Sequence, residues 1–584
     1  MARESTVTAA PPTRLRRVGG RGPWPQWVPR AMLPVALAVW LVSLRRVQLE
    51  RMGDLGLLQV LPVWFWVAVA LLTLGFVAAL RDLRVGKGWL AGYLLALVMM
   101  IHATPSLLYP ALRYSWAWKH IAVLDAMLRH NGTVPNAQGL DIYNQWPGFF
   151  QINALLLRVT GMHSALGYAA WAPVFFNVLL LGPLLLLYRS VSSDRRVVWG
   201  GVWIFYSASW VGQDYFAPQA FAFLLYASLL AVLIRRLHEP GVHGWPPGRL
   251  LMLLLIEFAI ASSHQLTPLM LISALLMLAL PRRNRRTVLP LLAGAVGFTV
   301  LWDATVARPY LSANLHDLLH ALTSPDANVL SGLAGLGAAA PGQVLVAWVD
   351  RGMSAALFAL AAVAYWRRPW TRRTGVPLLA LSPLPLLVAN NYGGEMIFRA
   401  YLFSLPATAF LTAALLFAPS ERPRLRAVVV TGLLGTLLVG LFFGYYSKES
   451  MNWFSTDEVA AVRTTIDRAP PGSRIVSVTG DLPGADLHYD EHSRVVFSQD
   501  TLAERRALLV DPTSAILHAQ VGANGPTYLV LTRAQAAECY LTGTLPADTV
   551  ARLRAAADAL PALTPVYRGP DAVVYQYVAT TGTP

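Results

Sequence analysis

Residues 427–446 read AVVVTGLLGTLLVGLFFGYY, twenty consecutive positions without a charged side chain. A helix of about 20 apolar residues is what crosses the hydrocarbon core of a bilayer. The whole chain of 584 residues has the same character, with 55% hydrophobic residues, 13% charged residues and a mean hydropathy of +0.48. Soluble proteins are on average much less apolar. We therefore expect an integral membrane protein with many helical spans.

Twelve further apolar runs of spanning length, or slightly short of it, precede this one. They begin near Ala31, Val63, Trp89, Tyr168, Val197, Phe216, Leu250, Leu266, Val288, Met353, Val376 and Tyr401. Pro183 and Pro385 interrupt two of the runs, which membrane helices tolerate when neighbouring helices satisfy the freed backbone groups. The predicted fold class is an α-helical polytopic membrane protein with about thirteen helices, which occupy residues 31–446.

The basic residues predict which side of the membrane each loop faces, because Lys and Arg in short loops are retained in the cytoplasm. Twenty-six of them fall in the N-terminal arm and in alternate loops, all on one side, against eleven on the other side. Residues 1–30 are then a disordered basic arm, and the N-terminus is cytoplasmic. Arg45, Arg46 and Arg51 are the main exception, and we expect them on an interfacial helix.

The sequence changes character after Tyr446. Ser455 and Glu458 form a capping-box pattern that opens an amphipathic helix. Short β-rich runs follow at 474–478, 528–531 and 572–577. From residue 451 onward the chain holds ten Arg against fourteen Asp or Glu, so the positive charge belongs to the membrane part. Residues 447–584 are predicted to form a small α/β domain outside the cytoplasm.

Composition also limits the partners and cofactors. The formal net charge of +16 does not indicate a nucleic-acid partner, because the basic residues are scattered in short clusters rather than gathered on one surface. The single Cys539 excludes an intrachain disulfide and a cysteine metal cluster. The sequence contains no Walker loop, zinc motif or dinucleotide fingerprint. The expected surroundings are the lipid bilayer.

The longest early outer loop covers residues 105–167. Its stretch from 106 to 161 reads SLLYPALRYSWAWKHIAVLDAMLRHNGTVPNAQGLDIYNQWPGFFQINALLLRVTG. Residues 116–130 have helical periodicity and carry Asp125, and Asn131-Gly132 breaks the pattern. Tyr143 and Pro147 follow, and then an apolar helix that ends in Thr160-Gly161. Charge at membrane depth is costly, so ionisable residues at the outer ends of spans are the first candidates for a site.

This order of features is similar to the first outer loop of the GT-C membrane glycosyltransferases, which include the protein O-mannosyltransferases and the lipid A aminoarabinose transferases. The resemblance covers approximately residues 85–450. It implies a GT-C-like fold and an enzyme of the cell membrane that transfers a sugar from a polyprenyl-phosphate donor on the outer face. It also implies that Asp125 and Asp214, the latter in the next outer loop, are the catalytic acids.

The resemblance has two departures. The loop follows the third span, whereas members of the superfamily usually have it after the first, so two extra N-terminal spans are needed. Many members carry adjacent acids in this loop, whereas Leu124 and Ala126 flank Asp125 here.

Several polar residues on the outer side resemble the superfamily's groups near the donor phosphate. Arg399 is the first choice, because the planar guanidinium donates two parallel hydrogen bonds to a phosphate. The predicted substrate-binding residues are Arg399, Glu395, His264, Lys119, Arg113, Tyr143 and Gln213. A divalent cation is a candidate cofactor. The acceptor would be an envelope glycan, lipid or protein.

Each candidate has a structural alternative. Asp125 with Arg129, and Glu395 with Arg399, have the i,i+4 spacing of ordinary helix ion pairs. The remaining alternatives are a cap on the next helix for Asp214, a satisfied helix-end position for His264, and ordering of the loop for Asp141 and Tyr143.

At the level of the whole chain, the rivals are a secondary transporter and a noncatalytic protein with the same fold. Transporters place ionisable groups near the bilayer midplane, often in repeated halves. Glu257 is the one clear acid well inside a predicted span, and the sequence has no obvious internal repeat.

Overall fold

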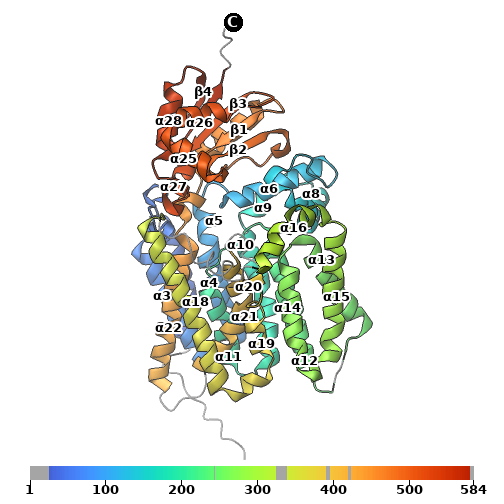
Figure 1. The fold of residues 1–584 in the computed structure, drawn as a ribbon. Coiled ribbons are helices and arrows are strands. Elements are labelled where there is room, and N and C mark those ends of the chain that lie inside the picture. Colours follow the sequence, from blue (N-terminus) through green and yellow to red (C-terminus); the bar gives the residue numbers. More distant parts are fainter. Residues whose placement is uncertain are drawn as a thin grey trace, which may run out of the picture.

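The computed structural model describes residues 25, 27–241, 244–323, 338–389, 395–417 and 423–578. A tall bundle of helices carries a smaller domain of strands and helices at one end, and the loop that contains α6, α8 and α9 lies between the two (Figure 1). The predicted basic arm, residues 1–30, falls almost wholly outside the described residues. The domain boundaries drawn from the sequence therefore stay predictions.

A helix lies at each of the thirteen predicted positions. The bundle consists of α1 (Trp27–Leu44), α3 (Val63–Arg81), α4 (Lys87–Val98), a π-helical turn (Met99–Ala103), α5 (Thr104–Leu108), α10 (Ala172–Val191), α11 (Arg195–Ala208), α12 (Pro218–Leu237), α13 (Pro247–Ser263), α14 (Thr267–Ala279), α15 (Arg285–Ala304), α18 (Pro341–Arg367), α19 (Val376–Leu381), α20 (Leu386–Ala389), α21 (Met396–Leu416) and α22 (Pro423–Tyr446). Within the described residues, nine helices are long and apolar enough to cross a membrane. The protein is therefore a multi-pass membrane protein.

The other four predicted spans are shorter helices. The run near Val376 forms α19 and α20, separated by a turn that contains Pro383 and Pro385. Proline lacks a backbone N–H and clashes with the preceding turn, so two of them end a helix.

The helix α21 lies inside the bundle and is almost wholly buried. It packs on α11 at Gly200, where a Cβ would lie 2.2 Å from the ring of Phe417.

The interfacial helix predicted for Arg45 to Arg51 is wrong. The chain leaves α1 at Leu44 and forms only a three-residue helical turn (Leu49–Arg51), followed by α2 (Leu57–Val60). Gly53 and Gly56 lie between these two pieces, and Gly56 has a φ of +54°. Glycine at such a position interrupts a continuous helix.

The outer loop is built from short helices. It contains α6 (Ser115–Arg129), a turn (Gln138–Leu140), α7 (Ile142–Gln145), α8 (Gly148–Thr160) and α9 (Leu166–Ala169), and α16 (Arg308–Thr323) follows α15. The predicted helix that carries Asp125 is α6, and it ends where Asn131 and Gly132 have φ values of +54° and +100°. Asn131-Gly132 is therefore a turn, as the sequence indicates.

The C-terminal domain is a mixed sheet between helices. Its elements are α23 (Glu449–Asn452), α24 (Thr456–Arg468), β1 (Arg474–Ser477), β2 (Ser493–Val496), α25 (Leu502–Val510), α26 (Pro512–His518), β3 (Thr527–Thr532), α27 (Arg533–Thr542), α28 (Thr549–Ala559), β4 (Leu563–Arg568) and β5 (Ala572–Tyr577). The strand order is β2-β1-β3-β5-β4, with β1 parallel to β2 and β3 and the β5 pairings antiparallel. The predicted capping box at Ser455 and Glu458 is present, and it starts α24.

Alternate side chains of the sheet face different helices, as the two-residue period of a strand requires. Ile475 of β1 and Val530 of β3 pack with α24 on one face. Val476 and Leu529 pack with α25, α26 and α28 on the other. The small α/β domain predicted after Tyr446 is thus a three-layer unit.

Candidate functional site

A cavity of about 750 Å³ opens between α18, α21 and α22, next to the C-terminal domain. The loop between α11 and α12 forms another wall, and Leu541 and Thr542 of α27 contribute to the rim. The described lining residues include three cationic side chains, Arg351, Arg399 and Lys448, and two acidic ones, Asp350 and Glu395. Apolar side chains such as Phe358, Leu384 and Leu387 complete the wall. A cavity that is mostly apolar, with a few convergent polar groups, is the usual form of a small-molecule site.

Arg399 lies in the first turn of α21 and is 7% exposed. Its Nη2 donates to Glu395 Oε2 at 2.7 Å, and its Nη1 donates to the side-chain carbonyl of Gln219. The Glu395 side chain is 51% exposed, whereas that of Arg399 is 9% exposed. The predicted i,i+4 pair is therefore present, and it lines the cavity. The phosphate-binding role of Arg399 stays a prediction.

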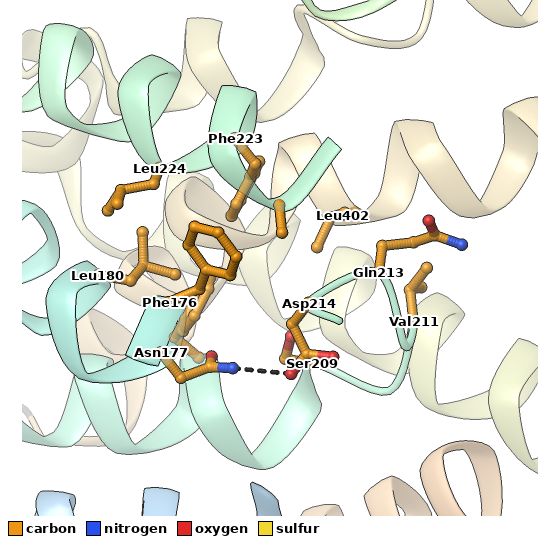
Figure 2. Close-up of a pocket in the computed structure, with 12 residues that line it drawn as sticks. Phe176, Asn177, Leu180, Ser209, Val211, Gln213, Asp214, Phe223, Leu224 and Leu402 are labelled. Carbon is orange, nitrogen blue, oxygen red and sulfur yellow. Dashed lines mark hydrogen bonds between the residues drawn. The ribbon is translucent and has the colours of Figure 1, made fainter. Parts of the chain in front are cut away.

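Asp214 does not line the large cavity, but it is hydrogen-bonded to Tyr445, which does. Its carboxylate accepts hydrogen bonds from Asn177 Nδ2 at 2.7 Å and from the Tyr445 hydroxyl at 3.0 Å, and it lies 2.9 Å from His102 Nδ1. Figure 2 shows Asn177 and Asp214 facing each other beside a small pocket with Phe176 and Leu180. Tyr445 itself lines the large cavity.

The charge of Asp214 follows from these neighbours. Burial acts to raise the pKa of the Asp214 carboxyl, but His102, Arg113 and the Tyr445 hydroxyl hold that pKa below its ordinary value. Asp214 is therefore held as a carboxylate. The predicted alternative, a cap on the next helix, is wrong, because α12 has Ala217 at its N-cap and no side-chain cap.

His102 lies on the π-helical turn of the third span. Such turns are rare and occur frequently at functional sites. The His102 Nδ1 also lies 2.9 Å from the Tyr445 hydroxyl, and its Nε2 is buried without a hydrogen-bond partner among the described residues. Neither His102 nor Tyr445 was predicted, because a histidine or tyrosine inside an apolar run carries no motif.

Arg113 forms a second buried pair close by. Its Nη2 donates to Glu449 Oε1 at 2.6 Å and to the Tyr445 carbonyl at 2.9 Å. Burial acts to lower the pKa of the Arg113 guanidinium, but Glu449 and the surrounding tyrosines raise it well above its ordinary value. The Tyr109 hydroxyl donates to Glu449 Oε2 at 2.7 Å. These contacts join the outer loop to the end of α22, next to the cavity.

Asp125 does not line the cavity. Its Oδ2 accepts from Arg129 Nε at 2.9 Å and from the backbone N–H of His488 in the C-terminal domain at 3.2 Å. Arg129 in turn pairs with Asp490 and Glu491. The structure thus brings Asp125 to the interface between the outer loop and the C-terminal domain, and it does not bring Asp125 together with Arg399.

The remaining predicted residues are divided between several places. Gln213 lines the cavity. Lys119 lies 4.2 Å from the ring centroid of Trp116, and burial lowers the pKa of its ammonium although Asp481 and Glu538 act to raise it. The cavity lining does not include Lys119, Tyr143 or His264.

Tyr143 and His264 each contact a polar group of the protein, and their predicted roles in substrate binding stay predictions. The Tyr143 hydroxyl lies 2.8 Å from His120 Nε2. His264 ends α13, and its Nδ1 accepts from the backbone N–H of Thr267 at 3.2 Å. Asp141 accepts from the side-chain amides of Asn144 and Gln145, three and four residues further along the chain, and so orders the loop.

A divalent cation finds no ready ligand set. Among the described residues, no group of three or more His, Cys, Asp or Glu side chains is arranged to hold a metal ion. Protein sites for Mg²⁺ or Ca²⁺ are built mainly from carboxylate and carbonyl oxygens.

Asp350 lines the cavity and was not predicted from the sequence, and the same is true of Arg351 and Lys448. Asp350 lies on α18 and is 7% exposed. The helix α18 begins at Pro341, twelve residues before the apolar run that starts near Met353, so Asp350 and Arg351 have the appearance of a loop flanking a span.

Comparison with known proteins gives matches among solved structures alone. No protein-family model matches the chain. No curated protein matches it either. The chain is similar to the oligosaccharyltransferase AglB of Archaeoglobus fulgidus, solved with an inhibitory peptide and a dolichol-phosphate, at 11% identity, with 85% of this chain and 75% of that chain covered and a TM-score of 0.49.

A second match is ArnT of Cupriavidus metallidurans bound to undecaprenyl phosphate, at 13% identity, with 85% and 100% covered and a TM-score of 0.49. The apo form of ArnT covers 96% of this chain and 99% of its own, at 12% identity and a TM-score of 0.45. The roles of individual residues rest on the cavity itself.

Proposed function

We propose that this chain is a membrane glycosyltransferase that transfers a sugar from a polyprenyl-phosphate donor to a cell-envelope acceptor on the outer face. The observation that carries the proposal is the buried guanidinium of Arg399 in the wall of a cavity between membrane helices. The planar fork of a guanidinium fits a phosphate.

The size and the lining of the cavity support a lipid-linked sugar as ligand. Its volume of about 750 Å³ is within the range of small-molecule sites, roughly 300 to 1,000 Å³. Arg351, Arg399 and Lys448 supply positive charge for the phosphate. Phe358 and Leu387 supply apolar surface for the first isoprene units.

The transfer requires one bond to form and one to break. The acceptor hydroxyl oxygen attacks the anomeric carbon, the bond from that carbon to the phosphate oxygen breaks, and polyprenyl phosphate leaves with the bonding electrons. The hydroxyl proton passes to a carboxylate, and Arg399 offsets the charge on the departing phosphate. Asp125 and Asp214 are the predicted acids, and Asp214 is the one joined to the wall through Tyr445.

The sidedness of the site is part of the proposal. The C-terminal domain forms part of the cavity rim, and the distribution of Lys and Arg assigns that domain to the outside. The N-terminus is then cytoplasmic. A donor phosphate held at Arg399 would sit in the outer leaflet, where envelope acceptors are reached.

Gene deletion with complementation tests the proposal. We expect the deletion strain to accumulate a lipid-linked sugar and to lack one envelope glycan, and the wild-type gene to restore both. Arg399→Gln, present in the membrane in the same amount, would restore neither. Unchanged lipid-linked sugars together with altered solute uptake would refute the proposal and favour the transporter.

A further inference from the structure

Asp350 is a buried acid in the wall of the cavity, and neither the chemistry above nor the predicted site uses it. Its residue exposure is 7%, and its Oδ1 has no hydrogen-bond partner within the described parts of the chain. Burying a carboxylate without partners is expensive. A protein tolerates such a group where a ligand supplies the missing donors.

The backbone of α22 makes room for this carboxylate. Gly444 faces Asp350, and a Cβ at Gly444 would lie 2.6 Å from Asp350 Oδ1 and 2.8 Å from the Cβ of Trp210. Any side chain larger than hydrogen at residue 444 would therefore displace one of the two. Asp350 and Trp210 flank the same point of the cavity wall.

The surroundings of Asp350 suit a sugar. The Trp210 Nε1 donates to Ser354 Oγ at 3.2 Å, and the rings of Trp210 and Tyr401 are 5.5 Å apart at 32°. The Ser354 hydroxyl also lines the cavity. Sugar hydroxyls donate well to a carboxylate, and the C–H face of a sugar ring packs on an aromatic ring.

Charge decides how a sugar phosphate would lie in the cavity. A phosphate is attracted to the cationic side chains of the lining, Arg351, Arg399 and Lys448. The hydroxyl-bearing end of the same ligand offers O–H donors, and the Oδ1 of Asp350 is an acceptor without a partner among the described residues. Asp350 therefore suits the hydroxyls of the ligand, and the cationic side chains suit its phosphate.

We propose that Asp350 accepts a hydrogen bond from a hydroxyl of the donor sugar, and so determines which sugar phosphate the enzyme accepts. This inference rests on the proposed function, since it names a part of the same site. A hydrogen bond to a charged group contributes enough to change affinity by roughly 10- to 100-fold. A site built around such a bond also discriminates strongly against an analogue that lacks the hydroxyl.

Binding measurements with two kinds of probe test the role of Asp350. The wild-type protein in nanodiscs is titrated with undecaprenyl phosphate, and with undecaprenyl phosphate esterified to mannose, glucose or arabinose. The variants are Asp350→Asn and Gly444→Ala, of which the second displaces the carboxylate without removing it. Gly435→Ala is the matched control, because Gly435 lies on the same helix and a Cβ there meets nothing within 4 Å.

We expect the affinity of both variants for the preferred sugar-linked lipid to fall roughly 10- to 100-fold. Their affinity for undecaprenyl phosphate should stay within about twofold of that of the Gly435→Ala control. If Gly444→Ala and Asp350→Asn bind the sugar-linked lipid as tightly as the control, the inference is wrong. Normal affinity with lost turnover would also overturn it, and would identify Asp350 as a proton acceptor instead.

If the proposed function itself is wrong, the wild-type protein binds neither undecaprenyl phosphate nor any of its sugar esters. The inference then falls together with the function.

Discussion

Replacing Glu395 by Gln should strengthen the binding of a lipid phosphate, which is an unusual result for removing a residue from a binding site. Glu395 Oε2 accepts from Arg399 Nη2 at 2.7 Å and so competes with a phosphate for the same donor. The Glu395 side chain is 51% exposed, which makes the pair weak, of order 1 kcal/mol or less. Freeing the guanidinium is therefore expected to tighten undecaprenyl phosphate binding by about fivefold.

Changes to Arg399 itself give the opposite sign. Arg399→Gln removes two charge-assisted hydrogen bonds to the phosphate and should weaken binding by about 100-fold. Arg399→Lys keeps the charge without the planar fork, so a loss of about tenfold is expected. Glu239→Gln is the matched control, because Glu239 pairs with Arg236 at 2.9 Å outside the cavity.

Native mass spectrometry of the purified variants with undecaprenyl phosphate would measure these affinities directly. Thermal unfolding of each variant checks that the fold is intact. Weaker binding by Glu395→Gln, or full affinity in Arg399→Gln, would refute the assignment of the phosphate to this pair.

Three further predictions concern the acids. Asp214→Asn should lower turnover in a transfer assay by roughly 10- to 100-fold and leave lipid phosphate binding unchanged, because a carboxamide cannot accept from all the donors around residue 214. Unchanged turnover would contradict the role of Asp214. Asp125→Asn should keep turnover within about tenfold of the wild-type value, because Asp125 contacts the C-terminal domain rather than the cavity. Complete loss of transfer would instead establish the catalytic role that the resemblance implies. Burial acts to raise the pKa of Asp490, but Arg129 holds it below its ordinary value of 3.8, so Asp490 contributes stability above that pH and loses it as the pH falls through the lowered pKa. Acidification should then accelerate the proteolytic release of the C-terminal domain more in the wild type than in Asp490→Asn, which lacks the carboxylate at every pH. An equal acceleration in the two proteins would refute the contribution.

The membrane part of the fold was predictable because it depends on local composition. Each of the thirteen apolar runs contains a helix, since a long apolar segment satisfies its backbone groups in no other way inside a bilayer. The interruptions were harder to place. Pro183 lies inside the continuous helix α10, whereas Pro383 and Pro385 separate α19 from α20.

In the C-terminal domain, the local sequence pattern predicts the central strands but not the edge strands. Strands β1, β3 and β5 are at the predicted positions, because they are central and apolar. The two edge strands were not predicted. The strand β4 contains Pro565, which a strand tolerates at an edge but not in the middle of a sheet, and β2 has only four half-buried residues.

The candidate site was predicted in part. The resemblance to the GT-C loop implied Arg399, Glu395 and Gln213, and all three line one cavity. Contacts between distant segments could not be foreseen. Asp125 meets His488, which is 363 residues later in the chain, and Asp350 meets Gly444.

Cysteine labelling tests most directly the claim that this cavity receives a lipid phosphate from the outer side. Lys448 is exposed and lines the cavity, and the single native Cys539 is buried, so Lys448→Cys in a Cys539→Ser background gives one reactive site. A membrane-impermeant maleimide applied to right-side-out vesicles should label residue 448, and undecaprenyl phosphate should slow the labelling. Labelling only after the membrane is permeabilised, or at a rate that the lipid does not change, would contradict the account.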